Sequence, residues 1–268
     1  MKKKLLAAVL CGAMALSLVA CGGSGTGNGT SEKPLRKVTK QINYTPSTGE
    51  KQNETETHYD KNGRETYKKF TSYNTGANRD ETMTTETTYN WVENGDTVTA
   101  DLLGGNSETI TYDKDGNVIK RLTKTMIGHT EYVYTYKNGV QATMVMTTVQ
   151  SDTVLTVLEA SFDERGNLAK YVYKDSTGKV MYSYDQTYEY DKAGKILSST
   201  MKVLGTDGQS QDVKYDYVYD ANGFLDKIEV DGTLTTDYTC DSKGNTIEIK
   251  SYTSGLLTSE THYEYYEN

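Results

Sequence analysis

Three histidines and one acidic loop are the groups in this sequence whose chemistry could serve a metal ion. His58, His129 and His262 lie far apart in the chain, and no two of them have metal-ligand spacing. The segment DKDGN at residues 113–117 faintly resembles a calcium loop, but it lacks the full set of acidic residues and the distal bidentate glutamate of such loops. The sequence therefore predicts no metal site.

Motifs for covalent or phosphate chemistry are absent from the sequence as well. It contains no G-x-S-x-G, Walker or dinucleotide-binding pattern. The 37 acidic residues could still supply a pair of carboxylates for glycoside hydrolysis, although nothing in the sequence singles out a pair. We therefore expect a protein that is not an enzyme and has no cofactor, with a glycosidase on a β scaffold as a remote alternative.

The chemistry that the sequence marks most clearly is lipid attachment at Cys21. Three lysines, Lys2–Lys4, precede an apolar run of 16 residues, Leu5–Ala20, which is shorter than the ~20 residues of a membrane-spanning helix. The run ends in Leu18-Val-Ala-Cys21, which resembles the lipobox of bacterial lipoproteins. The resemblance implies cleavage before Cys21 and a lipid on that residue, which would anchor the protein to the outer face of the cell membrane.

A flexible tether follows the predicted lipid. The segment GGSGTGNGTSEK, residues 22–33, has nothing to bury, and twelve such residues reach roughly 20 Å. We predict a signal peptide over 1–20, a lipidated cysteine and tether over 21–34, and a β-repeat domain over 35–268.

The charge of the chain argues against a nucleic-acid partner. The formal net charge is −8, and it becomes −11 if the three N-terminal lysines leave with the signal peptide. Binders of nucleic acids are normally basic, because they neutralise phosphates. We therefore expect no nucleic acid among the partners.

A repeated turn motif organises the rest of the sequence. Six segments have the form aromatic-Asp-x-x-Gly, with cysteine in place of the aromatic in the last: Tyr59-Asp60 with Gly63, Tyr112-Asp113 with Gly116, Phe162-Asp163 with Gly166, Tyr190-Asp191 with Gly194, Tyr219-Asp220 with Gly223, and Cys240-Asp241 with Gly244. Such spacing favours a type I turn that ends in a G1 bulge, in which glycine adopts a positive φ.

Further turns separate these motifs. Asn94-Gly95 and Asn138-Gly139 are typical of type I′ turns, and looser turns are expected near Gly128, Ser151-Asp152, 176–178 and Ser254-Gly255. No segment after the predicted signal peptide has helical periodicity over ten residues. The sequence therefore predicts an all-β fold with almost no helix, a long antiparallel meander of roughly 16–18 strands.

The stretch Tyr219–Ile249, YDANGFLDKIEVDGTLTTDYTCDSKGNTIEI, resembles the YD or RHS repeat family. It has the Tyr-Asp-x-x-Gly turn, a short second turn at Asp231-Gly232, and a 21-residue step from Asp220 to Asp241. The resemblance implies a curled or single-layer sheet of repeats in an exported protein, associated with adhesion, carbohydrate contact or toxin packaging. Because no toxin domain is present, packaging is not expected here.

Tyrosines recur at every second position before several turns, so they share one face of a strand. Such a face is either a platform for stacking on neutral sugars or the core of a sheet that curls on itself. Trp91, the only tryptophan, has the same two interpretations. The candidate ligand contacts, expected to be exposed, are Trp91, Tyr132, Tyr134, Tyr136, Tyr215 and Tyr217.

Three functions remain open at this point. The first is a lipid-anchored surface module for binding or adhesion, with neutral glycans as the ligand, and the second is a passive structural or spacer lipoprotein. The third is the glycosidase. Exposed aromatic rings would favour binding, whereas a fully covered tyrosine face would favour the spacer.

Overall fold

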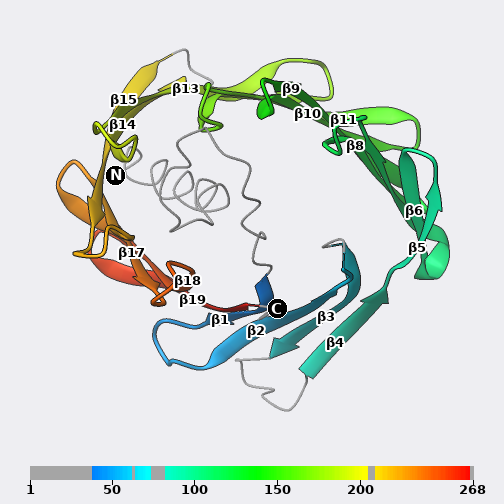
Figure 1. Ribbon diagram of the computed structural model, residues 1–268, viewed down its shortest axis with the longest axis horizontal. Coiled ribbons are helices and arrows are strands. Elements are labelled where there is room, and N and C mark those ends of the chain that lie inside the picture. Colours follow the sequence, from blue (N-terminus) through cyan, green and yellow to red (C-terminus); the bar gives the residue numbers. More distant parts are fainter. Residues whose placement is uncertain (1–37, 62–63, 74–81, 205–208, 266–268) are drawn as a thin grey trace. The chain divides into compact units, whose positions relative to one another are not determined.

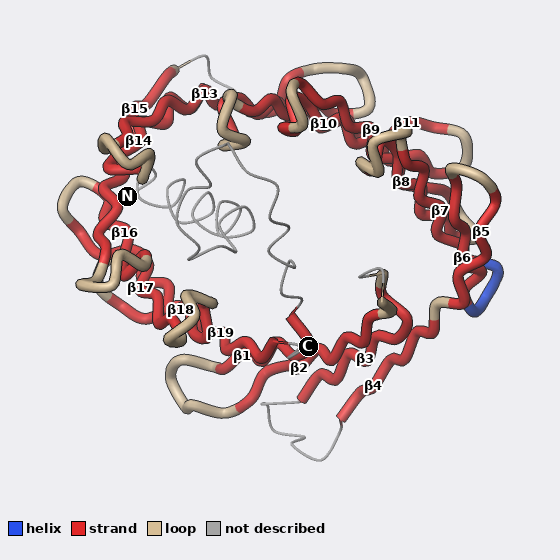
Figure 2. Tube along the Cα trace, in the orientation of Figure 1, coloured by secondary structure: helices blue, strands red, loops and turns tan. Residues whose placement is uncertain are grey.

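The computed structural model describes residues 38–61, 64–73, 82–204 and 209–265 (Figures 1 and 2). Nineteen strands and one short 3-10 turn, Leu103–Gly105, make up the described elements, and no α-helix is among them. The predicted all-β antiparallel meander is therefore confirmed, with slightly more strands than expected. The predicted signal peptide and tether lie outside the described residues. None of the described segments is a helix long and apolar enough to cross a membrane.

The chain divides into two compact units. The first contains residues 1–87, 188–199 and 213–268, and the second contains 88–187 and 200–212. Strands β13 (Val180–Tyr190), β14 (Ile196–Leu204) and β15 (Ser210–Tyr219) contribute residues to both units.

In the first unit, consecutive strands pair antiparallel from the end of β15 through β19, and β19 then pairs with β1, which pairs with β2 and through it reaches β3 (Figure 1). The first and last described strands are thus neighbours. The strands are β1 (Val38–Tyr44), β2 (Lys51–Tyr59), β3 (Glu65–Tyr73), β4 (Thr82–Thr88), β16 (Leu225–Val230), β17 (Thr233–Cys240), β18 (Thr246–Thr253) and β19 (Leu256–Tyr265).

The second unit is a meander in which each strand pairs antiparallel with the next, from β5 to β13. Its strands are β5 (Asn90–Asn94), β6 (Thr97–Leu102), β7 (Asn106–Tyr112), β8 (Val118–Thr125), β9 (Gly128–Lys137), β10 (Val140–Gln150), β11 (Thr153–Phe162) and β12 (Leu168–Asp175), followed by most of β13.

The Asp-x-x-Gly motif forms the expected turn. At Asp113 the carboxylate accepts hydrogen bonds from the backbone N–H groups of Asp115 and Asn117, both at 2.9 Å, and Gly116 has a φ of +83°. The strand register shifts at Tyr112, as a G1 bulge requires. Glycine is needed here because a side chain is strained at this φ.

Two sequence-based turn assignments need correction. The segment around Ser176 is a full member of the repeat, because Asp175 accepts from Thr177 N–H at 2.9 Å and Gly178 has a φ of +82°. The turn at Asn94-Gly95 is closed by the pair Asn94 and Thr97, so Gly95 is its first central residue. Only Gly95 has a positive φ, +65°, which fits a type II′ turn and not type I′. Asn138-Gly139 does have the type I′ pattern, with φ values of +55° and +77°.

Tyrosine hydroxyls close a second recurring contact beside these turns. Tyr219, the last residue of β15, donates to the carbonyl of Ile196, the first residue of β14, at 2.8 Å. Tyr59, Tyr136 and Tyr265 make the equivalent bonds to Val38, Val118 and Thr246 at 2.8, 3.0 and 2.7 Å. Part of the tyrosine content therefore ties the beginning of one strand to the end of the next.

Candidate aromatic binding face

Strand register in the second unit gathers tyrosines onto one side of strands β9–β13. One row of paired residues crosses the sheet from Tyr132 in β9 through Met146, Leu158 and Tyr173 to Tyr182 in β13. A parallel row runs from Tyr134 through Met144 and Ala160 to Tyr171 and Tyr184. We call this surface the aromatic face, and it consists of Tyr132, Tyr134, Met144, Met146, Leu158, Ala160, Tyr171, Tyr173, Tyr182 and Tyr184.

The rings of the aromatic face stack on one another. Tyr171 and Tyr184 have ring centroids 5.2 Å apart and planes only 4° apart, and Tyr132 and Tyr134 are 6.4 Å apart at 7°. Tyr182 donates a hydrogen bond to the hydroxyl of Tyr171 at 3.2 Å. Cross-strand aromatic pairs of this kind stabilise a sheet that has few leucines and phenylalanines. They also hold the rings nearly parallel.

The aromatic face is half-buried along most of its length. Tyr132, Tyr134, Tyr171, Tyr173 and Tyr182 retain partial exposure, whereas Tyr184 is only 4 % exposed. Burial raises the pKa of Tyr134 and, further, that of Tyr171, so both hydroxyls stay protonated at neutral pH. The face therefore offers ring surface and neutral hydroxyl groups to a ligand.

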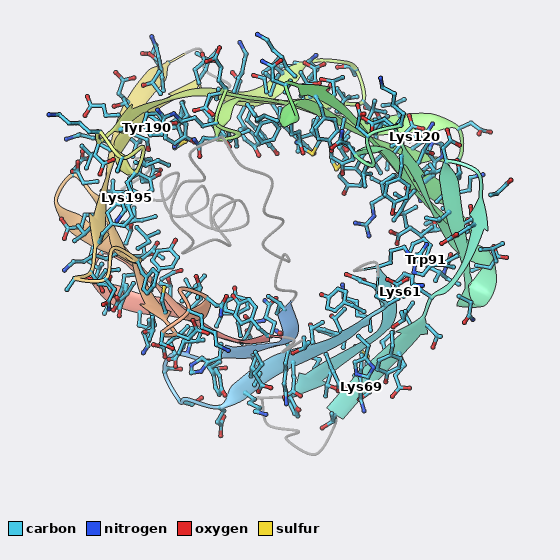
Figure 3. All side chains as sticks on the ribbon, viewed as in Figure 1. Lys61, Lys69, Trp91, Lys120, Tyr190 and Lys195 are labelled. Atoms are coloured by element: carbon cyan, nitrogen blue, oxygen red, sulfur yellow. The ribbon has the colours of Figure 1, made fainter. Side chains whose placement is uncertain are left out.

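The opposite side of strands β8–β13 combines polar groups with valines, such as Val133 opposite Val145. Lys120, labelled in Figure 3, pairs with Glu131, and Lys170 pairs with Asp185 at 3.5 Å. Thr135 and Thr143 share a hydroxyl–hydroxyl bond at 2.7 Å. The sheet of the second unit therefore has one aromatic side and one side of threonines, valines and ion pairs. This division is the alternation that a sheet with one hydrated face shows.

A buried carboxylate marks the β7–β8 edge of the aromatic face. Glu108, 4 % exposed, pairs with Arg121 at 2.6 Å, and Arg121 lies opposite Tyr132 in the sheet. Trp91 (Figure 3) lies opposite Ala100, which lies opposite Glu108, so Trp91 points to the same side of this sheet. Trp91 is half-buried and stacks on Tyr89 at 5.9 Å.

The remaining sequence candidates occupy different surroundings. Tyr215 and Tyr217 are 2 % and 8 % exposed, so the expectation that these rings are exposed contacts is wrong. They lie opposite Val230 and Ile228 on a covered face of the first unit, and the hydroxyl of Tyr217 bonds to Ser199 at 3.2 Å. Tyr136 is half-buried, and its hydroxyl is engaged with Val118. The structure thus brings together Tyr132 and Tyr134 in β9, with Trp91 on the same side of the sheet. Tyr136 follows on the same face of β9 with its hydroxyl bonded to Val118, whereas Tyr215 and Tyr217 are covered.

Sequence analysis missed one polar cluster in the first unit. Glu248, Glu260 and His262 place ligand atoms within 4.8 Å of one another, although no histidine spacing indicated a site. Two features of the sequence and the hairpin together indicate this cluster. Glu260 and His262 are two residues apart and so share a strand face, and the hairpin register places Glu248 opposite His262.

Comparison with known proteins finds distant matches only among solved structures. No family model and no curated protein matches the chain. Among solved structures, a porin-like protein from Bacteroides vulgatus ATCC 8482 is 15 % identical over 86 % of this chain and 99 % of its own, with a TM-score of 0.46. A porin-like protein from Bacteroides uniformis ATCC 8492 is 12 % identical over 85 % of this chain and 98 % of its own, with a TM-score of 0.45.

A third similar structure is a toxin complex, TcdB2-TccC3-Cdc42, which is 19 % identical over 87 % of this chain, with a TM-score of 0.34. This chain spans 14 % of the length of that one. We take nothing about activity from these likenesses. The class that the strands and turns define is an all-β protein of repeated hairpins.

Proposed function

We propose that the protein is an exported, lipid-anchored surface protein whose β-repeat domain is a non-catalytic binding module for neutral glycans. The observation that carries the proposal is the half-exposed aromatic face of β9–β13. Tyrosine rings stack on the apolar C–H face of a sugar, while their hydroxyls bond at its edge. Since the chain is strongly acidic, an uncharged ligand also avoids the repulsion that an anionic one would meet.

The half-exposed guanidinium of Arg121 supports this proposal. Its side chain is 43 % exposed, and Arg121 lies beside Tyr132 at the edge of the aromatic face. Because its charge is already paired with Glu108, it can donate to a sugar hydroxyl without presenting a net positive site. Such a surface suits a polyhydroxylated, uncharged chain better than it suits a phosphate polymer.

A second candidate function is a passive spacer. The hydroxyl bonds of Tyr59, Tyr136, Tyr219 and Tyr265 favour it, because they show tyrosine used to hold strands together. In that case the stacked rings of the aromatic face would serve the sheet alone. The two functions differ in one measurable property, the affinity of the aromatic face for neutral glycans.

A glycan-binding measurement distinguishes the two functions. The chain without residues 1–20 and with Cys21→Ser would be applied to a glycan array, and each neutral glycan that binds would be titrated by intrinsic fluorescence. We expect Tyr132→Ala to weaken binding about three- to tenfold, the loss of one stacked ring. Val133→Ala, on the opposite side of the same strand, should leave the affinity unchanged.

Either of two outcomes would contradict glycan binding by the aromatic face. Absence of binding to every neutral glycan at millimolar concentration would favour the spacer. Binding that persists in the Tyr132→Ala, Tyr173→Ala double variant would place the ligand elsewhere. Circular dichroism of each variant separates a lost contact from a lost fold.

Lipid anchoring has its own test. Replacing Cys21 with serine removes the thiol that would carry the lipid, so the protein should move from the membrane fraction to the medium or periplasm. Ser24→Ala, in the adjacent tether, should leave the protein in the membrane fraction. Membrane association that persists in Cys21→Ser would show that another feature holds the protein there.

A further inference from the structure

Glu248, Glu260 and His262 form a compact cluster on the strand pair β18–β19 of the first unit. His262 Nε2 lies 2.8 Å from Glu260 Oε1 and 3.2 Å from Glu248 Oε1. The three side chains are 21–39 % exposed, so the cluster is partly open to solvent. Two adjacent strands of a paired sheet hold the cluster, which fixes its backbone.

The spacing of these atoms suits a small divalent metal. Zinc binds imidazole nitrogen and carboxylate oxygen at about 2.0–2.2 Å, so two ligands of a tetrahedral ion lie about 3.3 Å apart. The two distances to His262 Nε2 are close to that value before any adjustment. One imidazole and two carboxylates match the ligand number of a site that keeps one position open.

Neighbouring side chains fix the position of Glu248 by hydrogen bonds, and one of them also competes with a metal for it. Lys250 donates to Glu248 Oε1 at 2.9 Å, and Thr239 donates to Glu248 Oε2 at 3.1 Å. A metal that binds Glu248 Oε1 would have to displace the ammonium group of Lys250 from that oxygen.

A ring contact further restricts the histidine. The ring of Tyr44, at the end of β1, lies 4.8 Å from the ring of His262 at an angle of 59°. This contact limits rotation of the imidazole, so the ring is held near Glu248 and Glu260. A restricted ring loses less freedom when it binds an ion.

We propose that Glu248, Glu260 and His262 bind a first-row divalent transition metal, with zinc as the probe ion. The imidazole ligand favours zinc, nickel or copper over calcium and magnesium, which take oxygen ligands. Binding of the metal releases Lys250 from Glu248. The partial exposure and the lysine both point to a modest affinity.

The chain contains a matched control for this site. Glu56-Thr57-His58 repeats the order of Glu260-Thr261-His262, and His58 Nε2 lies 2.6 Å from Glu56 Oε1. Among the described residues, however, only the Glu248 cluster brings three metal-ligating side chains together. Loss of His58 should therefore leave specific metal binding intact.

Calorimetric titration of the full chain with zinc chloride tests the proposal. His262→Ala should weaken the site about tenfold or more, His58→Ala should not change it, and Lys250→Met should strengthen it. Glu260→Gln, which keeps the size of the side chain, should also weaken it. Cysteines are the same in all these variants, so they cannot produce the differences.

Two results would overturn the metal site. One is an unchanged titration in His262→Ala, with the fold confirmed by circular dichroism. The other is an equal loss in His58→Ala, which would indicate only general attraction of the cation to an acidic surface.

Discussion

Gly128→Ala is expected to lower the free energy of unfolding by at least about 2 kcal/mol, the cost of forcing an atom into a packed site. Gly128 is the first residue of β9 and lies opposite Gln150 in β10. A Cβ at this position would press on the carbonyl oxygen of Val149 and would lie 2.9 Å from the Cα of Gln150. Since these neighbours are backbone atoms, no side chain can rotate away, and the strand pair itself must shift.

Gly139, at the other end of the same strand pair, supplies the control. Its φ is +77°, but a Cβ there would meet nothing within 4 Å. Gly139→Ala should therefore cost about 1 kcal/mol, the strain of a left-handed alanine. Urea unfolding of both variants gives the comparison. A loss in Gly128→Ala no larger than that in Gly139→Ala would contradict the close approach of β9 and β10.

This contrast shows which part of the fold the sequence could predict. The Asp-x-x-Gly turns are local, because the aspartate accepts from backbone N–H groups two, three and four residues further on, so the spacing of the motif is enough to locate them. The turn at 176–178 was predicted, but not as a member of the Asp-x-x-Gly repeat, because Lys174 stands where the other motifs have an aromatic or cysteine. The role of Gly128 depends on Val149 in the neighbouring strand, and no local pattern reports such a contact.

The candidate sites divide in the same way. Alternation correctly placed Tyr132 with Tyr134 and Tyr215 with Tyr217 on shared strand faces. The spacing within each pair is identical, yet one pair is half-buried and the other is covered. What covers a face depends on packing between distant segments, which periodicity does not contain. The Glu248 cluster likewise needs the exact hairpin register, since a shift of one residue would turn Glu248 to the other side.

Ten described tyrosines have a pKa raised above its ordinary value, with burial as the largest cause in each. They are Tyr59, Tyr67, Tyr134, Tyr136, Tyr171, Tyr184, Tyr217, Tyr219, Tyr263 and Tyr265. Burial disfavours the phenolate, so the folded protein holds these protons more tightly than the unfolded chain does. Alkaline pH should therefore act on the fold through many side chains at once.

We expect stability to fall steeply above about pH 10, the ordinary pKa of tyrosine in the unfolded chain. Because the folded pKa values are raised, the contribution is complete below that pH and is lost as the pH rises through the folded values, about 12 for Tyr265. Lys40, Lys51, Lys214 and Lys250 have raised pKa values and act in the same direction.

Urea unfolding between pH 8 and about 12, followed with tyrosinate absorbance, measures this loss. Tyr265→Phe removes one of the coupled protons, so its stability should depend less steeply on pH than that of the parent chain. The same variant also loses the bond to the Thr246 carbonyl, which lowers stability at every pH and leaves the slope as the informative quantity. The contradicting result would be ionisation of all tyrosines near pH 10 while the strands stay folded. That result would mean that the tyrosine rings are hydrated and not half-buried.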